Sequence, residues 1–163
     1  MSHITATFES KPQAEAALAL LENAGVREDQ VSVVVTEESL GNHFRIEEKS
    51  RADEGVAAGA TFGGVVGAIL GSVLAAGTIA VPGLNLVVVG SLASGLAGLG
   101  AGAAAGGLAG ALIGAGMNEH EARLHDDGVK KGNILLAIEP ETDAQLANVE
   151  NILRNSDAGN IIH

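Results

Sequence analysis

A block of 63 residues without a charged side chain constrains this chain more than any other feature. Residues 55–117 contain no Asp, Glu, Lys or Arg, although the whole sequence has 20 acidic and nine basic residues. The same block holds 18 of the 23 glycines. A helix that is apolar all round has to be buried, either in protein or in lipid. The chain therefore divides into an ordinary charged part, residues 1–54 and 118–163, and an inserted block, residues 55–117.

Small residues recur at every fourth position in two series within this block. Positions four apart lie on the same face of a helix, so each series is a strip without bulky side chains. The first series consists of Gly55, Gly59, Gly63, Gly67 and Gly71; the second consists of Gly90, Ser94, Gly98, Gly102, Gly106, Gly110 and Gly114. Pro82 and Gly83 lie between the two series and supply a turn. We therefore predict an inserted α-helical hairpin of two glycine-zipper arms.

The two glycine strips are expected to mediate helix packing or oligomerisation. Each glycine in a helix interior costs about 1 kcal/mol relative to alanine, and close backbone contact is what offsets this cost. Residues 56–81 would form a helix of roughly 39 Å, enough to cross a hydrocarbon core of about 30 Å. Acidic flanks and the lack of Trp and Tyr argue against the membrane. Two coverings remain open, a lipid bilayer and further copies of the chain.

The charged parts of the chain predict an α+β fold. Residues 3–8 alternate between apolar and polar side chains, which indicates a half-buried strand, and Pro12 and Gly25 bound the helix that follows. Residues 31–35 and 134–138 are apolar strands, Thr142 is a candidate N-cap for a second amphipathic helix, and residues 160–162 form a last short strand. This βαβ–insertion–βαβ order predicts a ferredoxin-like βαββαβ sandwich, with the hairpin between its second and third strands.

Two further segments connect these elements. Residues 37–54 are highly charged and are expected to form a connector. Residues 118–131 are expected to form a helix with Asn118 as its N-cap and Glu121 three residues later. Its apolar positions include Ala122, Leu124 and Val129.

Several stretches together resemble a known family. They are residues 8–17 (FESKPQAEAA), Gly25-Val26, the strand 31–35, the Gly-Ala block, and residues 119–131 followed by Gly-Asn-Ile-Leu-Leu at 132–136. In these features the chain resembles the bacterial general stress proteins of the heat-induced type, which combine a ferredoxin-like domain with a glycine-zipper segment. The resemblance covers nearly the whole chain. It implies a stress-related, non-enzymatic role and transfers no catalytic residue.

The composition argues against several functional classes. A net charge of −11 disfavours nucleic-acid binding, and without cysteine there is no thiolate metal site. His120 and His125 are five residues apart, so they do not share a helix face, and we interpret them as solvated side chains. Residues 86–90 (LVVVG) look like a strand entering a nucleotide loop, but no lysine follows. The zipper period accounts better for Gly90.

From the sequence we therefore expect no enzyme, no catalytic residue, no metal and no cofactor. The expected function is that of a self-associating structural protein whose partners are further copies of itself and, where its hairpin enters a membrane, a lipid bilayer. Two more functions stay open: a large soluble homo-oligomeric particle or scaffold, and a regulatory ferredoxin-like domain that binds a ligand. The N-terminus has no secretory signal pattern, which predicts a cytoplasmic location or the cytoplasmic face of an inner membrane.

Overall fold

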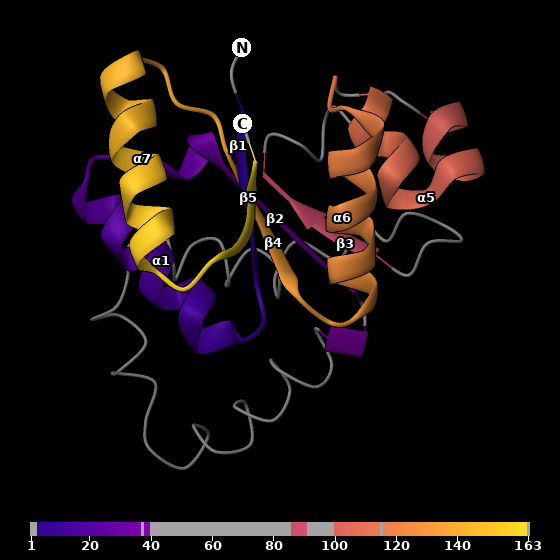
Figure 1. The fold of residues 1–163 in the computed structure, drawn as a ribbon, viewed down its shortest axis with the longest axis horizontal. Helices are drawn as coiled ribbons and strands as arrows, with labels where there is room; N and C mark the ends of the chain where they lie inside the picture. Colours follow the sequence, from indigo (N-terminus) through magenta and orange to yellow (C-terminus); the bar gives the residue numbers. More distant parts are fainter. Residues whose placement is uncertain (1–2, 37, 40–85, 91–99, 115, 163) are drawn as a thin grey trace.

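The chain forms a mixed α+β structure around one antiparallel sheet. The computed structural model describes residues 3–36, 38–39, 86–90, 100–114 and 116–162. The strands are β1 (Ile4–Phe8), β2 (Val31–Thr36), β3 (Leu86–Val89), β4 (Ile134–Ile138) and β5 (Gly159–Ile162). The helices are α1 (Lys11–Asn23), α5 (Gly100–Gly114), α6 (Glu119–Lys130) and α7 (Asp143–Asn155), with a short 3₁₀ turn, η1, at Glu28–Gln30. The sheet and its four helices are shown in Figure 1.

The five strands lie in the order β3-β2-β4-β1-β5, and every neighbouring pair is antiparallel. The register brings Thr5 of β1 opposite Ala137 of β4, and Ala137 opposite Ser32 of β2. Thr5 also lies opposite Ile162 of β5. Thr5, Ala137 and Ser32 therefore form a row of small or polar side chains across three neighbouring strands.

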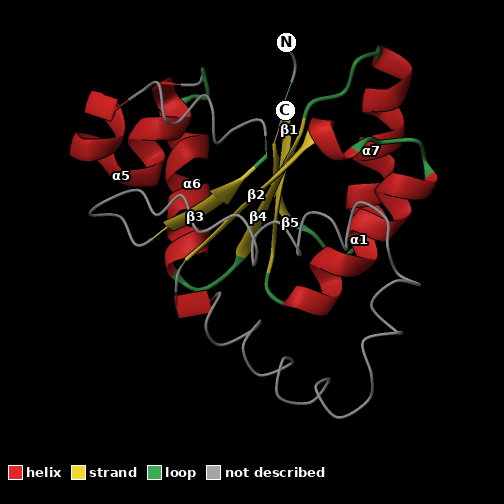
Figure 2. Ribbon diagram, turned by 180° about the vertical axis from the view of Figure 1, so that it is seen from behind, coloured by secondary structure: helices red, strands yellow, loops and turns green. Residues whose placement is uncertain are grey.

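Helices cover both faces of this sheet. In Figures 1 and 2, α1 and α7 lie on one side of the strands, while α5 and α6 lie on the other. We call the side of α1 and α7 the first face and the side of α5 and α6 the second face. Every residue of β1 and β4 is buried. The sheet thus forms the middle layer of three.

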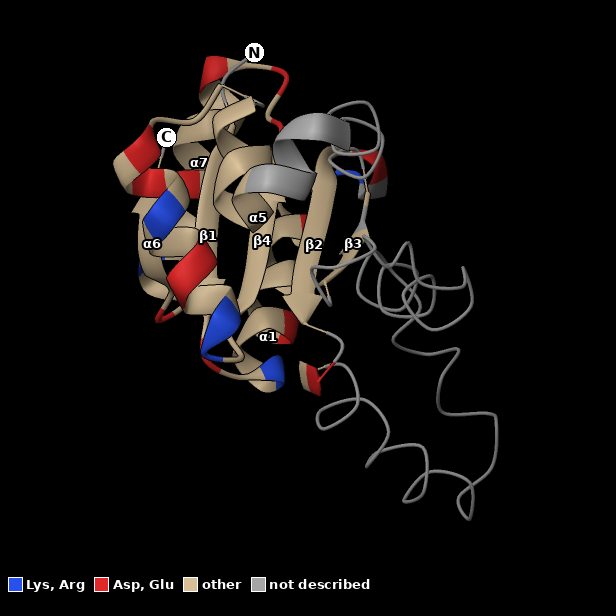
Figure 3. Ribbon diagram, turned by 90° about the vertical axis from the view of Figure 1, so that its right-hand side faces the viewer, with Lys and Arg blue, Asp and Glu red and all other residues tan. Residues whose placement is uncertain are grey.

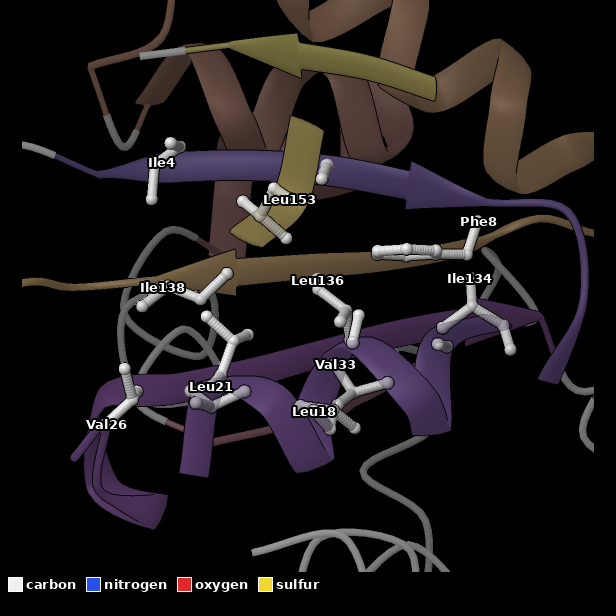
Figure 4. Close-up of a cluster of buried hydrophobic side chains, with 14 of the residues drawn as sticks. Ile4, Phe8, Leu18, Leu21, Val26, Val33, Ile134, Leu136, Ile138 and Leu153 are labelled. Atoms are coloured by element: carbon white, nitrogen blue, oxygen red, sulfur yellow. The ribbon is translucent and has the colours of Figure 1, made fainter. Parts of the chain in front are cut away.

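The first face carries the larger side chains of the core. Ile4, Phe8, Leu136 and Leu18 belong to one buried cluster there, which also includes Leu153 of α7. Figure 4 shows these side chains meeting between β1, β4 and α1. These side chains lie on elements that the sequence predicts in the charged parts of the chain, and those strands and helices are confirmed over the described residues.

The second face has a separate core, which the sequence pattern does not predict. This core contains Val34, Leu135, Leu108 and Val129, from two strands and the two helices that cover them. Thr5 is 2% exposed and Thr7 only 1%. The prediction of a half-buried first strand is therefore wrong, because α6 covers the face on which these threonines lie. Thr7 Oγ1 donates a hydrogen bond of 2.9 Å to the Gly159 carbonyl, so its hydroxyl is satisfied in the interior.

The charge-free block contributes directly to the folded body. β3 pairs with β2 from Val33↔Val89 to Thr36↔Leu86, and α5 packs against α6. Over its described residues the block is a strand followed by a helix, so the predicted hairpin of two helical arms is wrong at residues 86–89. β3 and α5 thus pack directly against elements of the charged parts of the chain.

The N-caps of two helices match the sequence prediction. Asn118 accepts a hydrogen bond from the backbone N–H of Glu121 at the start of α6. Thr142 accepts one from the N–H of Gln145 at the start of α7. Each side chain satisfies one of the free N–H groups at a helix start.

Among the described glycines, Gly90, the residue after β3, lies closest to the backbone of another strand. Its φ is +103°, and a Cβ placed on it would lie 2.3 Å from the carbonyl oxygen of Val31 and 2.7 Å from Cα of Ser32. No side chain fits there, because the backbone of β2 already occupies the space. Gly106 of α5 offers the opposite case, since a Cβ added there meets nothing within 4 Å.

We therefore expect Gly90→Ala to lower the free energy of unfolding by at least about 2 kcal/mol, through backbone strain and displacement of β3. The matched control, Gly106→Ala, should be neutral or stabilising by up to about 1 kcal/mol, because alanine is the better helix former. Urea unfolding followed by far-UV circular dichroism measures both. Equal stabilities for the two variants would contradict the close approach of β3 to β2.

Candidate functional site

The outward-facing side of α5 carries part of the second glycine series. Leu108, Ala111 and Leu112 of α5 are buried against the second face of the sheet. Gly106 and Gly114 are exposed, Gly110 is half-buried, and Ile113 is 42% exposed. We call Gly106, Gly110, Ile113 and Gly114 the outer face of α5. The sequence of α5 contains no charged residue, whereas the neighbouring α6 carries bands of both signs in Figure 3.

The glycine series on α5 does not form one straight strip. Gly107 has φ 64° and ψ −154°, so α5 consists of two helical segments joined at this residue. The predicted continuous helix through Gly102, Gly106, Gly110 and Gly114 is therefore wrong at Gly107. Glycine alone reaches this backbone conformation readily, and the Gly106-Gly107 pair supplies it where the chain bends. Gly110, Ile113 and Gly114 still share a face within the second segment.

The remaining residues of the predicted zipper lie elsewhere. Gly90 ends β3 with a left-handed backbone, so its predicted place in a helical series is wrong. The rest of the predicted packing and turn residues lie outside the described part of the chain: Gly55, Gly59, Gly63, Gly67, Gly71, Pro82, Gly83, Ser94 and Gly98.

A buried histidine lies beneath α6, on the second face of the sheet. His125 is 0% exposed, and its Nε2 shares a hydrogen bond of 2.7 Å with Oγ1 of Thr5. Its other nitrogen, Nδ1, is buried with no hydrogen-bond partner among the described residues. Burial lowers the pKa of His125 from 6.5 to about 4, and the charge of Glu121 acts in the opposite direction. The interpretation of His125 as a solvated side chain is therefore wrong. The spacing of Ala122, His125 and Val129 contained the signal, since it places all three on one helix face.

A shallow hollow on the opposite side of the molecule is lined mainly by charged and polar groups. It encloses about 780 Å³ between η1 and the segment from β4 to α7. Arg27 binds Glu141 through two hydrogen bonds of 2.6 and 3.0 Å, and Asp29 through two of 3.0 and 3.2 Å. These contacts raise the pKa of Arg27 and lower those of Asp29 and Glu141. Because the carboxylates of Asp29 and Glu141 bind the Arg27 guanidinium group, the described lining of this hollow offers no unpaired cation to an anionic ligand.

Gln30, which lines this hollow, is paired with the side chain of Gln145. The amides of Gln30 and Gln145 bond to each other in both directions, at 3.1 and 3.2 Å. Gln30, which is 4% exposed, also donates to the Glu139 carbonyl and accepts from the Arg27 N–H. The pair ties the start of β2 to the start of α7, which indicates a structural role.

The part of the chain that the structure describes holds no group of three or more His, Asp or Glu side chains arranged to bind a metal ion. Within the same residues, no helix has both the length and the hydropathy needed to cross a bilayer. The first predicted zipper arm, residues 56–81, is not among them.

In comparisons with known proteins, no protein-family model, no curated protein and no solved structure matches this chain. Its function is therefore inferred from the residues and their geometry.

Gln30→Ala is expected to lower the free energy of unfolding by about 2 kcal/mol, because it removes a buried side chain whose amide bonds to the Glu139 carbonyl, the Arg27 N–H and the Gln145 amide. Gln145→Ala should cost about 1 kcal/mol, since its site is half-buried and water replaces part of the amide. Chemical denaturation of the two single variants and the double variant gives the coupling between them. If the losses of unfolding free energy in the two single variants add up to the loss in the double variant, the two amides do not stabilise each other.

Proposed function

We propose that this chain is a non-enzymatic structural protein of the general stress type, which associates with further copies of itself through its charge-free, glycine-rich block. The outer face of α5 is the observation that carries the proposal. It is exposed, it lacks charge, and its glycines leave the helix backbone open to close approach.

Burial within α5 supports this assignment. The large side chains Leu108 and Leu112 point into the chain's own core, and the outer face keeps three glycines and a single large side chain, Ile113. An isolated surface helix normally carries polar side chains on its outer face. A helix whose inner face is apolar and whose outer face is mostly glycine suits close contact with a second helix.

The strand order supports a ferredoxin-like framework for the proposed protein. Without β3, the sheet reads β2-β4-β1-β5, with α1 and α7 on the first face. This is the arrangement expected of a βαββαβ chain whose two βα halves pack side by side. In this view β3, α5 and α6 are additions that extend the sheet and cover its second face.

Two environments fit the proposed association, and they differ in what covers the glycine-rich surface. In the first, the block embeds in the cytoplasmic face of a membrane. In the second, copies of the block cover one another in a large soluble particle. Detergent-free cell fractionation followed by native mass measurement separates them, since a lipid-embedded assembly sediments with membranes and a protein-only particle remains in the supernatant.

Gly106→Leu tests the proposal directly. Because the space around Gly106 is open in the single chain, the leucine should leave α5 intact and even raise its helix propensity by about 1 kcal/mol. In an assembly, the same side chain would hold two helix backbones apart, so we expect a smaller native mass. Light scattering after size exclusion measures it, with circular dichroism as the check on folding.

Gly106→Ala is the matched control, since a methyl group still permits close approach and the assembly should persist. A Gly106→Leu variant that folds and keeps the wild-type mass would refute the role of this face. A wild-type chain that is monomeric in both the membrane and the soluble fraction would refute self-association altogether.

A further inference from the structure

The two helices that cover the second face of the sheet, α5 and α6, form a separate layer of the molecule. Its core, which includes Val34, Leu135, Leu108 and Val129, shares no described residue with the core under α1 and α7. α5 and α6 are consecutive in the structure and pack against each other. A layer with its own core and continuous chain can open without dissolving the rest of the fold.

His125 lies at the contact between this layer and the sheet. It projects from α6 and meets Thr5 of β1 at 2.7 Å, and Thr5 Oγ1 lies 3.4 Å from the carbonyl oxygen of Ile162 on β5. The imidazolium form carries a proton on each ring nitrogen and needs an acceptor for both. Thr5 provides one at Nε2, while the described residues provide none at Nδ1.

The surroundings of His125 offer little compensation for a positive charge. Glu121, one turn earlier on α6, is the charged group whose field favours the imidazolium. The row of Thr5 continues with Ala137 and Ser32, which are neutral, and α5 has no ionisable side chain. In the next row of this face, His3 lies 3.6 Å from Glu139.

We propose that α5 and α6 form an acid-releasable cover, which leaves the second face of the sheet when His125 becomes protonated, while α1 and α7 stay in place. Release transfers the histidine to water, where both N–H groups find acceptors. It also exposes the apolar side chains of β2 and β4 on this face. The inference does not depend on self-association, because the contact lies on the inner side of the layer.

The direction of the pH effect follows from the pKa of His125. That pKa is 6.5 in the open state and about 4 when the cover is closed. The open state therefore binds the proton more readily, and the closed state is fully favoured only above pH 6.5. The ratio of closed to open molecules falls by about tenfold for each pH unit between 6.5 and 4, and stays constant below pH 4.

Hydrogen exchange of the full chain between pH 7.5 and 5.0 tests the proposal, because most carboxylates remain ionised in that range. After correction for the intrinsic exchange rate, the protection of α6 amides should fall by about 30-fold. The amides of α1 and α7 should change by less than about threefold over the same range, since their layer stays closed. Mass spectrometry of peptides from each helix gives both values in one experiment.

His125→Gln is the decisive variant, since glutamine can bond to Thr5 and does not titrate in this range. It should make the protection of α6 nearly independent of pH. His120→Gln is the matched control, because His120 is exposed on the same helix, and it should behave as the wild type.

Three results would overturn the proposal: equal loss of protection in all helices, an unchanged pH dependence in His125→Gln, or full protection of α6 at pH 5.0. If His125→Gln fails to fold, the ¹³C signals of the wild-type histidines replace it. A His125 that titrates near pH 6.5 while α6 remains protected would equally refute the release.

Discussion

Burial of the sheet on both faces is the constraint on which the rest of this structure depends. β2 and β4 place apolar side chains on either side, such as Val33 and Val34, so neither face can be left to solvent. The first face receives α1 and α7, which belong to the two βαβ halves. The second has to be covered by segments from elsewhere in the chain, and α5 and α6 supply that cover.

Small residues make this second layer possible. The chain has only 2% aromatic residues, so its packing relies on close approach rather than on bulk. Gly90 lets β3 lie against β2, and a Cβ on Gly128 of α6 would already lie 3.4 Å from the methyl group of Thr7. The buried threonines keep their hydroxyls bonded to His125 and to the Gly159 carbonyl, as burial of polar groups requires. Glycine-rich sequence therefore serves the interior of this chain as well as its surface.

The sequence predicts the structure correctly in those segments whose residue pattern is compatible with a single type of element. Short apolar runs predict the strands 31–35 and 134–138, and a capping residue with an amphipathic pattern predicts the helix after Thr142. The same reasoning misplaces Gly90 and misses the bend at Gly107, since glycine at a four-residue spacing suits a zipper, a close strand contact and a bend equally well. It also leaves Thr5 and His125 in solvent because each is polar, and the partner that each one finds lies 120 residues away in sequence. The periodicity of α6 places His125 on the buried face with Ala122 and Val129, but no local pattern identifies Thr5 as its partner.

The layer formed by α5 and α6 joins two properties that would act on each other. Its inner side closes over the sheet through His125, and its outer face is the surface proposed for association. A second copy bound to the outer face would favour the closed position of the layer by mass action, because only the docked α5 presents that face in a fixed geometry. Opening the layer would weaken association by the same free energy, since the two equilibria are linked. The proposed assembly and the proposed acid release would therefore oppose each other within a single structural element.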